Sequence, residues 1–103
     1  MRLRWTEPAL SDLDHLEQFI AQDSPVYARR FVLQLLNAAQ RLITFPQSGR
    51  YVPESQREDV REVIYCGYRI VYWIVEDDTI DILAVMHGSR DLSDPNFQPW
   101  KET

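Results

Sequence analysis

The stretch from residue 60 to residue 91 constrains the fold of this 103-residue chain more than any other part. It reads VREVIYCGYRIVYWIVEDDTIDILAVMHGSRD, in which three runs of β-branched and aromatic residues are separated by Cys66-Gly67 and Asp77-Asp78. Short apolar runs joined by tight breaks of this kind are typical of antiparallel hairpins. We therefore predict a three-stranded meander with strands at residues 60–65, 68–75 and 80–87.

The middle run of this meander is apolar on both of its faces. Tyr68 and Ile70 lie on one side of an extended chain, whereas Val71 and Trp73 lie on the other. A strand that is apolar on both faces is expected in the middle of a sheet, covered from above and below.

The first half of the chain carries helical signals. A short strand is expected at residues 3–5, followed by a helix capped by Thr6. Ser24 and Pro25 are a natural cap and first residue for a second helix that runs to about Ile43. Because the break between the two helices is short, they should form an antiparallel hairpin. Residues 50–59 are expected to form a polar loop.

The resulting order, β-α-α-β-β-β, predicts one α+β domain over residues 1–103. In this fold class an N-terminal short strand and an α-helical hairpin pack on a small antiparallel β-sheet. The uncovered face and the edges of that sheet are where we expect function. A C-terminal tail from about residue 91 to 103 contains Phe97 and Trp100, and aromatic residues in a polar tail predict docking onto the body or onto a partner.

Charge and composition exclude several functional classes. The net charge of −5 argues against a chain that binds DNA directly by itself, because such binders need a basic surface. No run approaches the roughly 20 apolar residues that span a bilayer. One cysteine and a start without an apolar signal core favour a cytoplasmic location. The spacings of histidine, cysteine and acidic residues predict no metal site, and we expect no cofactor.

Three polar residues of the second half combine the chemical groups used in metal-free RNA cleavage. They are Glu54 in the loop, Arg69 on the middle strand and His87 at the end of the last strand. A base and an acid move protons while a guanidinium neutralises the phosphorane, and Arg69 and His87 are expected to face each other. The alternative is structural: Arg69 pairs with Asp81 or Glu62, and His87 caps the strand end.

Two further arginines have both structural and functional interpretations. Arg61 alternates with Glu62 on a strand, which favours a cross-strand ion pair. Arg90 follows the last strand, where it either binds a partner or ties down the tail.

The segments GRYVPE, VREVI, GYRIVY and AVMHGSRD, in that order, resemble the RelE/ParE toxins of bacterial type II toxin–antitoxin modules. The resemblance covers nearly the whole chain and implies the β-α-α-β-β-β fold. RelE-like members cleave mRNA in the ribosomal A site, whereas ParE-like members inhibit DNA gyrase. Both kinds are neutralised by a cognate antitoxin that wraps around the toxin.

This chain departs from the RelE-like pattern at three places. Val63 and Gly88 stand where basic residues would be expected, and no tyrosine follows Tyr72. The acidic charge also fits poorly with docking into ribosomal RNA.

The resemblance therefore implies a ParE-like toxin that inhibits DNA gyrase by protein–protein contact, with growth inhibition and plasmid stabilisation as its biological effects and no enzymatic activity. The residues expected to bind the target are Arg61, Arg90, Phe97 and Trp100. The alternative is a ribosome-dependent mRNA endonuclease, with the ribosome and mRNA as partners and Glu54, Arg69 and His87 as catalytic residues.

Overall fold

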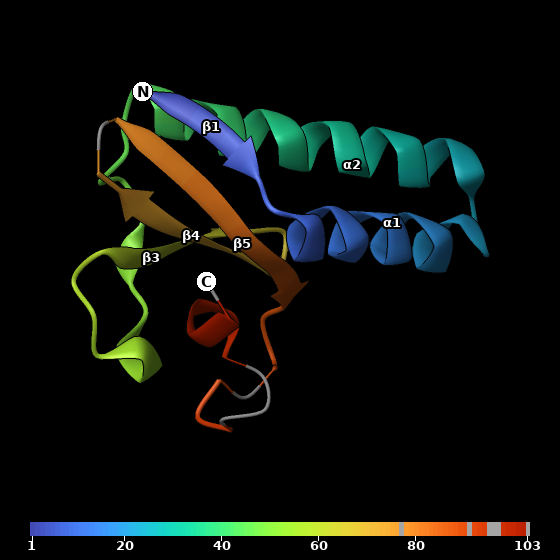
Figure 1. The fold of residues 1–103 in the computed structure, drawn as a ribbon. Coiled ribbons are helices and arrows are strands. Elements are labelled where there is room, and N and C mark those ends of the chain that lie inside the picture. Colours follow the sequence, from blue (N-terminus) through green and yellow to red (C-terminus); the bar gives the residue numbers. More distant parts are fainter. Residues whose placement is uncertain (77, 91, 95–97, 103) are drawn as a thin grey trace.

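The computed structural model, which describes residues 1–76, 78–90, 92–94 and 98–102, has the predicted order of elements (Figure 1). The helices and strands are β1 (Arg2–Trp5), α1 (Glu7–Ala21), α2 (Pro25–Gln40), β2 (Arg50–Tyr51), β3 (Val60–Tyr65), β4 (Tyr68–Val75) and β5 (Thr79–His87). Short 3₁₀ helices are η1 (Arg41–Ile43), η2 (Pro53–Ser55) and η4 (Pro99–Glu102). The α+β fold class is confirmed.

Both helices begin where the sequence predicts. The Thr6 side chain accepts a hydrogen bond from the Ala9 N–H, and the Ser24 side chain accepts one from the Tyr27 N–H. These bonds satisfy backbone donors that the first turn of a helix leaves unpaired. In Figure 1 the two helices run side by side as an antiparallel hairpin.

The five-stranded sheet has the order β1-β5-β4-β3-β2, so β4 is central as predicted. Two details differ from the prediction. β1 runs parallel to β5, which makes the sheet mixed instead of wholly antiparallel. In addition, residues expected to be loop form β2, whose Arg50 lies opposite Glu62. Pairing between segments distant in sequence depends on tertiary packing, and local residue patterns do not report it.

Both faces of the sheet are covered, so the expectation of an uncovered face is wrong. The helical hairpin buries one face around Leu13, Phe31 and Leu35. The other face carries a second cluster, which includes Val52 from the loop and Leu92 and Trp100 from the tail. Figure 1 shows η4 beside the sheet on the side away from the helices. Within the described part of the chain, no helix has the length and apolarity needed to cross a membrane.

Candidate functional site

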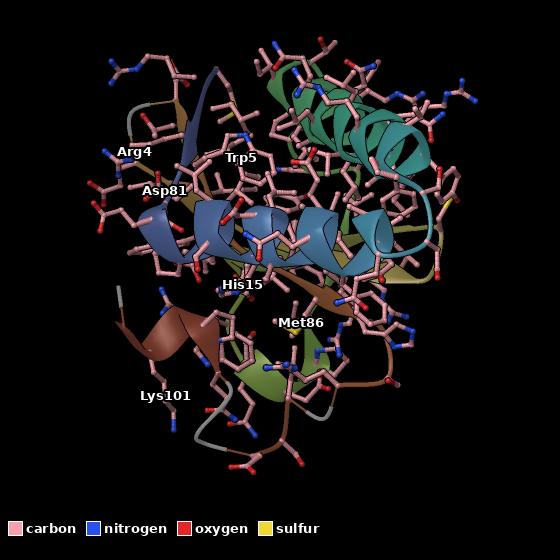
Figure 2. The ribbon with its side chains drawn as sticks, turned by 90° about the vertical axis from the view of Figure 1, so that its right-hand side faces the viewer. Arg4, Trp5, His15, Asp81, Met86 and Lys101 are labelled. Carbon is pink, nitrogen blue, oxygen red and sulfur yellow. The ribbon has the colours of Figure 1, made fainter. Side chains whose placement is uncertain are left out.

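Arg69 is the second residue of β4, on the face away from the helices, and is only 5% exposed. Its Nε donates to a carboxylate oxygen of Glu62, which is itself 1% exposed. Its Nη2 lies 3.5 Å from Oε1 of Glu54. Of the two structural partners predicted for Arg69, Glu62 is therefore the one observed. The other, Asp81, instead binds Arg4 at 2.7 Å. Figure 2 labels both residues near the start of α1.

The strand register explains how this cluster forms. Glu62 of β3 lies opposite Val71, on the same face of β4 as Arg69 two residues earlier. The second carboxylate oxygen of Glu62 accepts a hydrogen bond from Nε of Arg50 at 2.7 Å. Two arginines thus meet two glutamates, and their formal charges cancel. Buried charges need such compensation because removal from water disfavours a lone ion.

The C-terminal tail covers the same face. Nη1 of Arg69 donates to the backbone carbonyl of Arg90 at 3.5 Å, and Trp100 packs in the second cluster with only 5% exposure. The Trp100 side chain is therefore buried against the body of the domain, which is one of the two kinds of docking predicted for the tail. Its role in binding a target stays a prediction. Phe97, the other aromatic residue assigned to target binding, lies outside the described residues.

His87 does not join Glu54 and Arg69. It lies opposite Tyr68 in the register of β4 and β5, whereas Arg69 lies opposite Met86. Because successive residues of a strand point to opposite faces, His87 is on the helix side and Arg69 on the other. The His87 ring meets the Tyr68 ring edge-on, at 5.5 Å between centroids. The expectation that Arg69 and His87 face each other is therefore wrong by one residue of register.

His87 instead lines a pocket of about 230 Å³ between α1 and the end of β5. The side chains of Asp12, His15 and Arg90 line the same pocket. Figure 2 shows His15 on the side of α1 toward Met86, which also lines it. Sequence reasoning missed Asp12 and His15, since one turn of an amphipathic helix gives no signal for which strand end it will approach.

The Asp12 side chain hydrogen-bonds to the part of the β5 edge with which β1 does not pair. β1 pairs with β5 only as far as Ile82, and beyond that point Oδ2 of Asp12 accepts a hydrogen bond from the Val85 N–H at 3.0 Å. Burial raises the pKa of the Asp12 carboxyl above its ordinary value. The Val85 hydrogen bond and the nearby charges of Arg90 and His15 oppose this shift but are smaller.

We expect Asp12→Asn to stabilise the protein at neutral pH. A carboxyl whose pKa is raised on folding contributes to the folding stability below its unfolded pKa. That stabilisation is lost as the pH rises through the folded pKa. Asparagine keeps an oxygen acceptor for Val85 without the desolvated charge. The free energy of unfolding of both proteins, measured by urea titration, should differ most at neutral pH and converge in acid. Asp14→Asn, on the exposed side of the same helix, controls for net charge; equal gains from both variants would contradict the prediction.

Arg61 does not form the predicted cross-strand ion pair. Its Nη1 donates to the backbone carbonyls of Gln47 and Gly49, at 3.2 and 2.8 Å. Its guanidinium stacks over the Tyr51 ring at 4.2 Å from the centroid. The adjacent Glu62 points to the opposite face of β3, where it is held by Arg50 and Arg69. Arg61 therefore fastens the loop before β2 to the sheet.

A groove of about 600 Å³ lies along the outer edge of β3, beside the end of α2. Phe45, which lines it, is 63% exposed, and Ile64 is 49% exposed. In the described structure β2 pairs with residues 61 and 62 of β3, and the rest of that edge has no strand beside it. The Tyr72 hydroxyl shapes the groove by donating to the Pro46 carbonyl at 2.8 Å and accepting from the Gly49 N–H at 3.0 Å.

Among the residues that the structure describes, no group of three or more His, Cys, Asp or Glu side chains could hold a metal ion.

Residues 3–92 match the family model described as ParE toxin of the type II toxin–antitoxin system parDE. The chain is 31% identical over 86 residues to Toxin RelE2 of Caulobacter vibrioides, covering 84% of this chain and 93% of that protein. It is 36% identical over 91 residues to Putative toxin Y4kP of Sinorhizobium fredii, covering 86% and 90%.

Solved structures give the same picture of the fold. A chain of the chromosomal ParDE toxin–antitoxin system from P. aeruginosa superposes with a TM-score of 0.70 at 23% identity, covering 84% of this chain and 95% of that one. A chain of the toxin–antitoxin complex RelBE2 from Mycobacterium tuberculosis gives a TM-score of 0.61 at 25% identity, with the same coverage of 84% and 95%.

Proposed function

Because this chain belongs to the ParE toxin family of type II toxin–antitoxin systems, we propose that it inhibits DNA gyrase by protein–protein contact. A cognate antitoxin neutralises it, as expected for the toxin of such a pair. Free toxin then arrests growth by blocking replication. It uses no cofactor and performs no chemistry of its own.

The state of Arg69 is the observation that carries this proposal. An RNA-cleaving site needs a guanidinium available to a phosphorane, held where charge develops in the transition state. Arg69 is instead buried, bound to Glu62 and within 3.5 Å of Glu54. A phosphate would have to displace these carboxylates and approach a region with no net positive charge. The overall charge of −5 also opposes docking into ribosomal RNA.

A ribosome-dependent mRNA endonuclease is the second candidate. The contact between Glu54 and Arg69 and the 31% identity to Toxin RelE2 favour it. In this alternative Glu54 acts as the proton acceptor and Arg69 as the phosphate ligand, and His87 would have to act from the opposite face.

Pulse-labelling of cells just after induction, without antitoxin, separates the two candidates. We expect thymidine incorporation to stop before methionine incorporation, because gyrase inhibition blocks replication first. A fall in methionine incorporation first would overturn the gyrase proposal and favour the ribosome. No fall in either label would contradict toxicity itself.

A variant that keeps the fold sharpens this experiment. Arg69→Ala would leave Glu62 buried and under-compensated, so loss of folding would imitate loss of function. Glu54→Gln changes only the partly exposed carboxylate near Arg69. We expect Glu54→Gln to remain as toxic as the unchanged chain and as the exposed control Glu58→Gln. Loss of toxicity in Glu54→Gln alone would support the endonuclease.

The edge groove of β3 is where we propose that the antitoxin docks. An extended antitoxin segment can add a strand to the sheet by pairing with residues 63–65 at the edge of β3. Its apolar side chains then enter the groove beside Phe45. Arg41 and Arg50 also line the groove, which suits an antitoxin segment carrying carboxylates.

We expect Phe45→Ala to weaken antitoxin binding about tenfold or more, as truncation of a central aromatic contact does at other interfaces. Phe19→Ala is the matched control, because Phe19 is 67% exposed at the far end of α1 and lies outside the groove. Calorimetry with the cognate antitoxin measures both. Equal effects of the two variants would place the antitoxin elsewhere.

A further inference from the structure

We propose that the pocket between α1 and the end of β5 binds a phosphate group. The chain contains two histidines, and both His15 and His87 line this pocket, although they come from opposite ends of the sequence. Arg90 also lines it. Two imidazoles and a guanidinium, brought by a helix, a strand end and the following turn, surround one space of about 230 Å³.

The hydrogen bonds of His87 determine which ring nitrogen serves a ligand. The Ser89 N–H lies 3.1 Å from Nδ1, so Nδ1 acts as an acceptor. The Ser89 hydroxyl, 2.7 Å from the same nitrogen, must then be a donor. The neutral ring therefore carries its proton on Nε2. Ser89 fixes the ring orientation and leaves Nε2–H as the hydrogen-bond donor for a bound group.

Asp12 balances the charge of Arg90 when the pocket is empty. Its carboxylate lies near enough to Arg90 and His15 for both charges to lower its pKa, against the larger effect of burial. It is also anchored by the Val85 N–H, so it cannot swing away. Tyr68 and Met86 complete the wall and supply no formal charge.

A phosphate suits these donors better than a carboxylate does. Its tetrahedral oxygens accept hydrogen bonds from several directions, whereas a carboxylate presents its oxygens in one plane. The phosphate comes either from a free small molecule or from a nucleic-acid backbone. The test of this inference is separate from that of gyrase inhibition, because it measures phosphate binding by the purified chain and not growth arrest.

The two histidines report directly on binding. Full-length chain, synthesised in a cell-free system, is titrated with inorganic phosphate at neutral pH and constant ionic strength, and the imidazole NMR signals are followed. We expect both histidines to shift along one common saturation curve. Absence of a shift, or two unrelated curves, would overturn the proposal.

Charge-matched variants distinguish specific phosphate binding in the pocket from non-specific attraction of phosphate to positive charge on the surface. Arg90→Gln should weaken phosphate binding about tenfold, the usual effect of losing one hydrogen bond to a charged group. Arg29→Gln removes the same charge from the exposed side of α2 and should change nothing. Asp12→Asn should tighten binding. Equal weakening by Arg29→Gln and Arg90→Gln would overturn the site. Chemical denaturation verifies that each variant is folded.

A second arm identifies the source of the phosphate. The same titration is repeated with a nucleoside monophosphate and with a short oligoribonucleotide. Tighter binding of the oligoribonucleotide supports a backbone phosphate, whereas equal or weaker binding supports a free phosphate compound. If neither ligand binds and inorganic phosphate also does not bind, the proposal is contradicted. None of these results changes the early loss of thymidine incorporation expected from gyrase inhibition.

Discussion

Glu62→Ala is expected to lower the free energy of unfolding by about 3–5 kcal/mol, as is typical when one partner of a buried ion pair is removed. Glu62 is 1% exposed and holds both Arg50 and Arg69. Arg50 is free to turn into water, since its side chain is 66% exposed. Arg69 is not, and the carboxylate left to it is Glu54 at 3.5 Å. Urea unfolding monitored by tryptophan fluorescence measures the loss.

Two companion variants test the reason for this effect. Glu58→Ala removes an exposed carboxylate from the same region and should stay within about 0.5 kcal/mol of the unchanged protein. Glu62→Met combined with Arg69→Met replaces the pair by apolar groups of similar length and should recover most of the stability. A loss below about 1 kcal/mol in Glu62→Ala would mean that water reaches the cluster.

The double variant also bears on function, because it removes Arg69 without leaving a lone buried charge. If the toxin acts by contact with gyrase, the folded double variant should still stop thymidine incorporation. Loss of toxicity with an intact fold would favour the endonuclease.

Trp100→Ala is expected to destabilise the protein by a similar amount, about 3–5 kcal/mol, because a large aromatic side chain leaves a cavity. Trp100 packs in the second cluster, which includes Val52, Val71 and Leu92. The neighbouring Lys101→Ala is the matched control on the same short helix and should have little effect, since Lys101 is exposed. Thermal unfolding measures both variants.

The same variant tests the role of the tail. If Trp100 contributes only packing, then Trp100→Phe should keep most of the stability and all of the toxicity. An unchanged unfolding temperature combined with lost toxicity in Trp100→Ala would mean that the indole contacts the target and not the body.

Local signals in the sequence were sufficient for the helices and strands of the fold other than β2. Thr6 and Ser24 mark the helix starts because a side-chain oxygen followed by helix-forming residues satisfies unpaired backbone donors. The meander follows from alternation and tight breaks, and the breaks are real turns with positive φ at Cys66, Gly67 and Asp78. The central position of β4 follows from its two apolar faces.

The site could be predicted only in part, because a strand residue changes face with every one-residue shift in register. Sequence reasoning correctly placed Glu62 among the possible partners of Arg69. It placed His87 opposite Arg69, whereas the observed register puts Met86 there. It also assigned Arg61 to an ion pair that the loop carbonyls of Gln47 and Gly49 replace.

Apart from β2, the sequence by itself determined the type and order of the helices and strands, since capping, alternation and turn chemistry act between residues that are close along the chain. Only the tertiary structure decided that β1 joins β5 in parallel, that the tail covers the second face and that His15 meets His87. These contacts join segments distant in sequence. Their partners are selected by how the helical hairpin and the sheet bury their apolar surfaces together, and no local pattern encodes that choice.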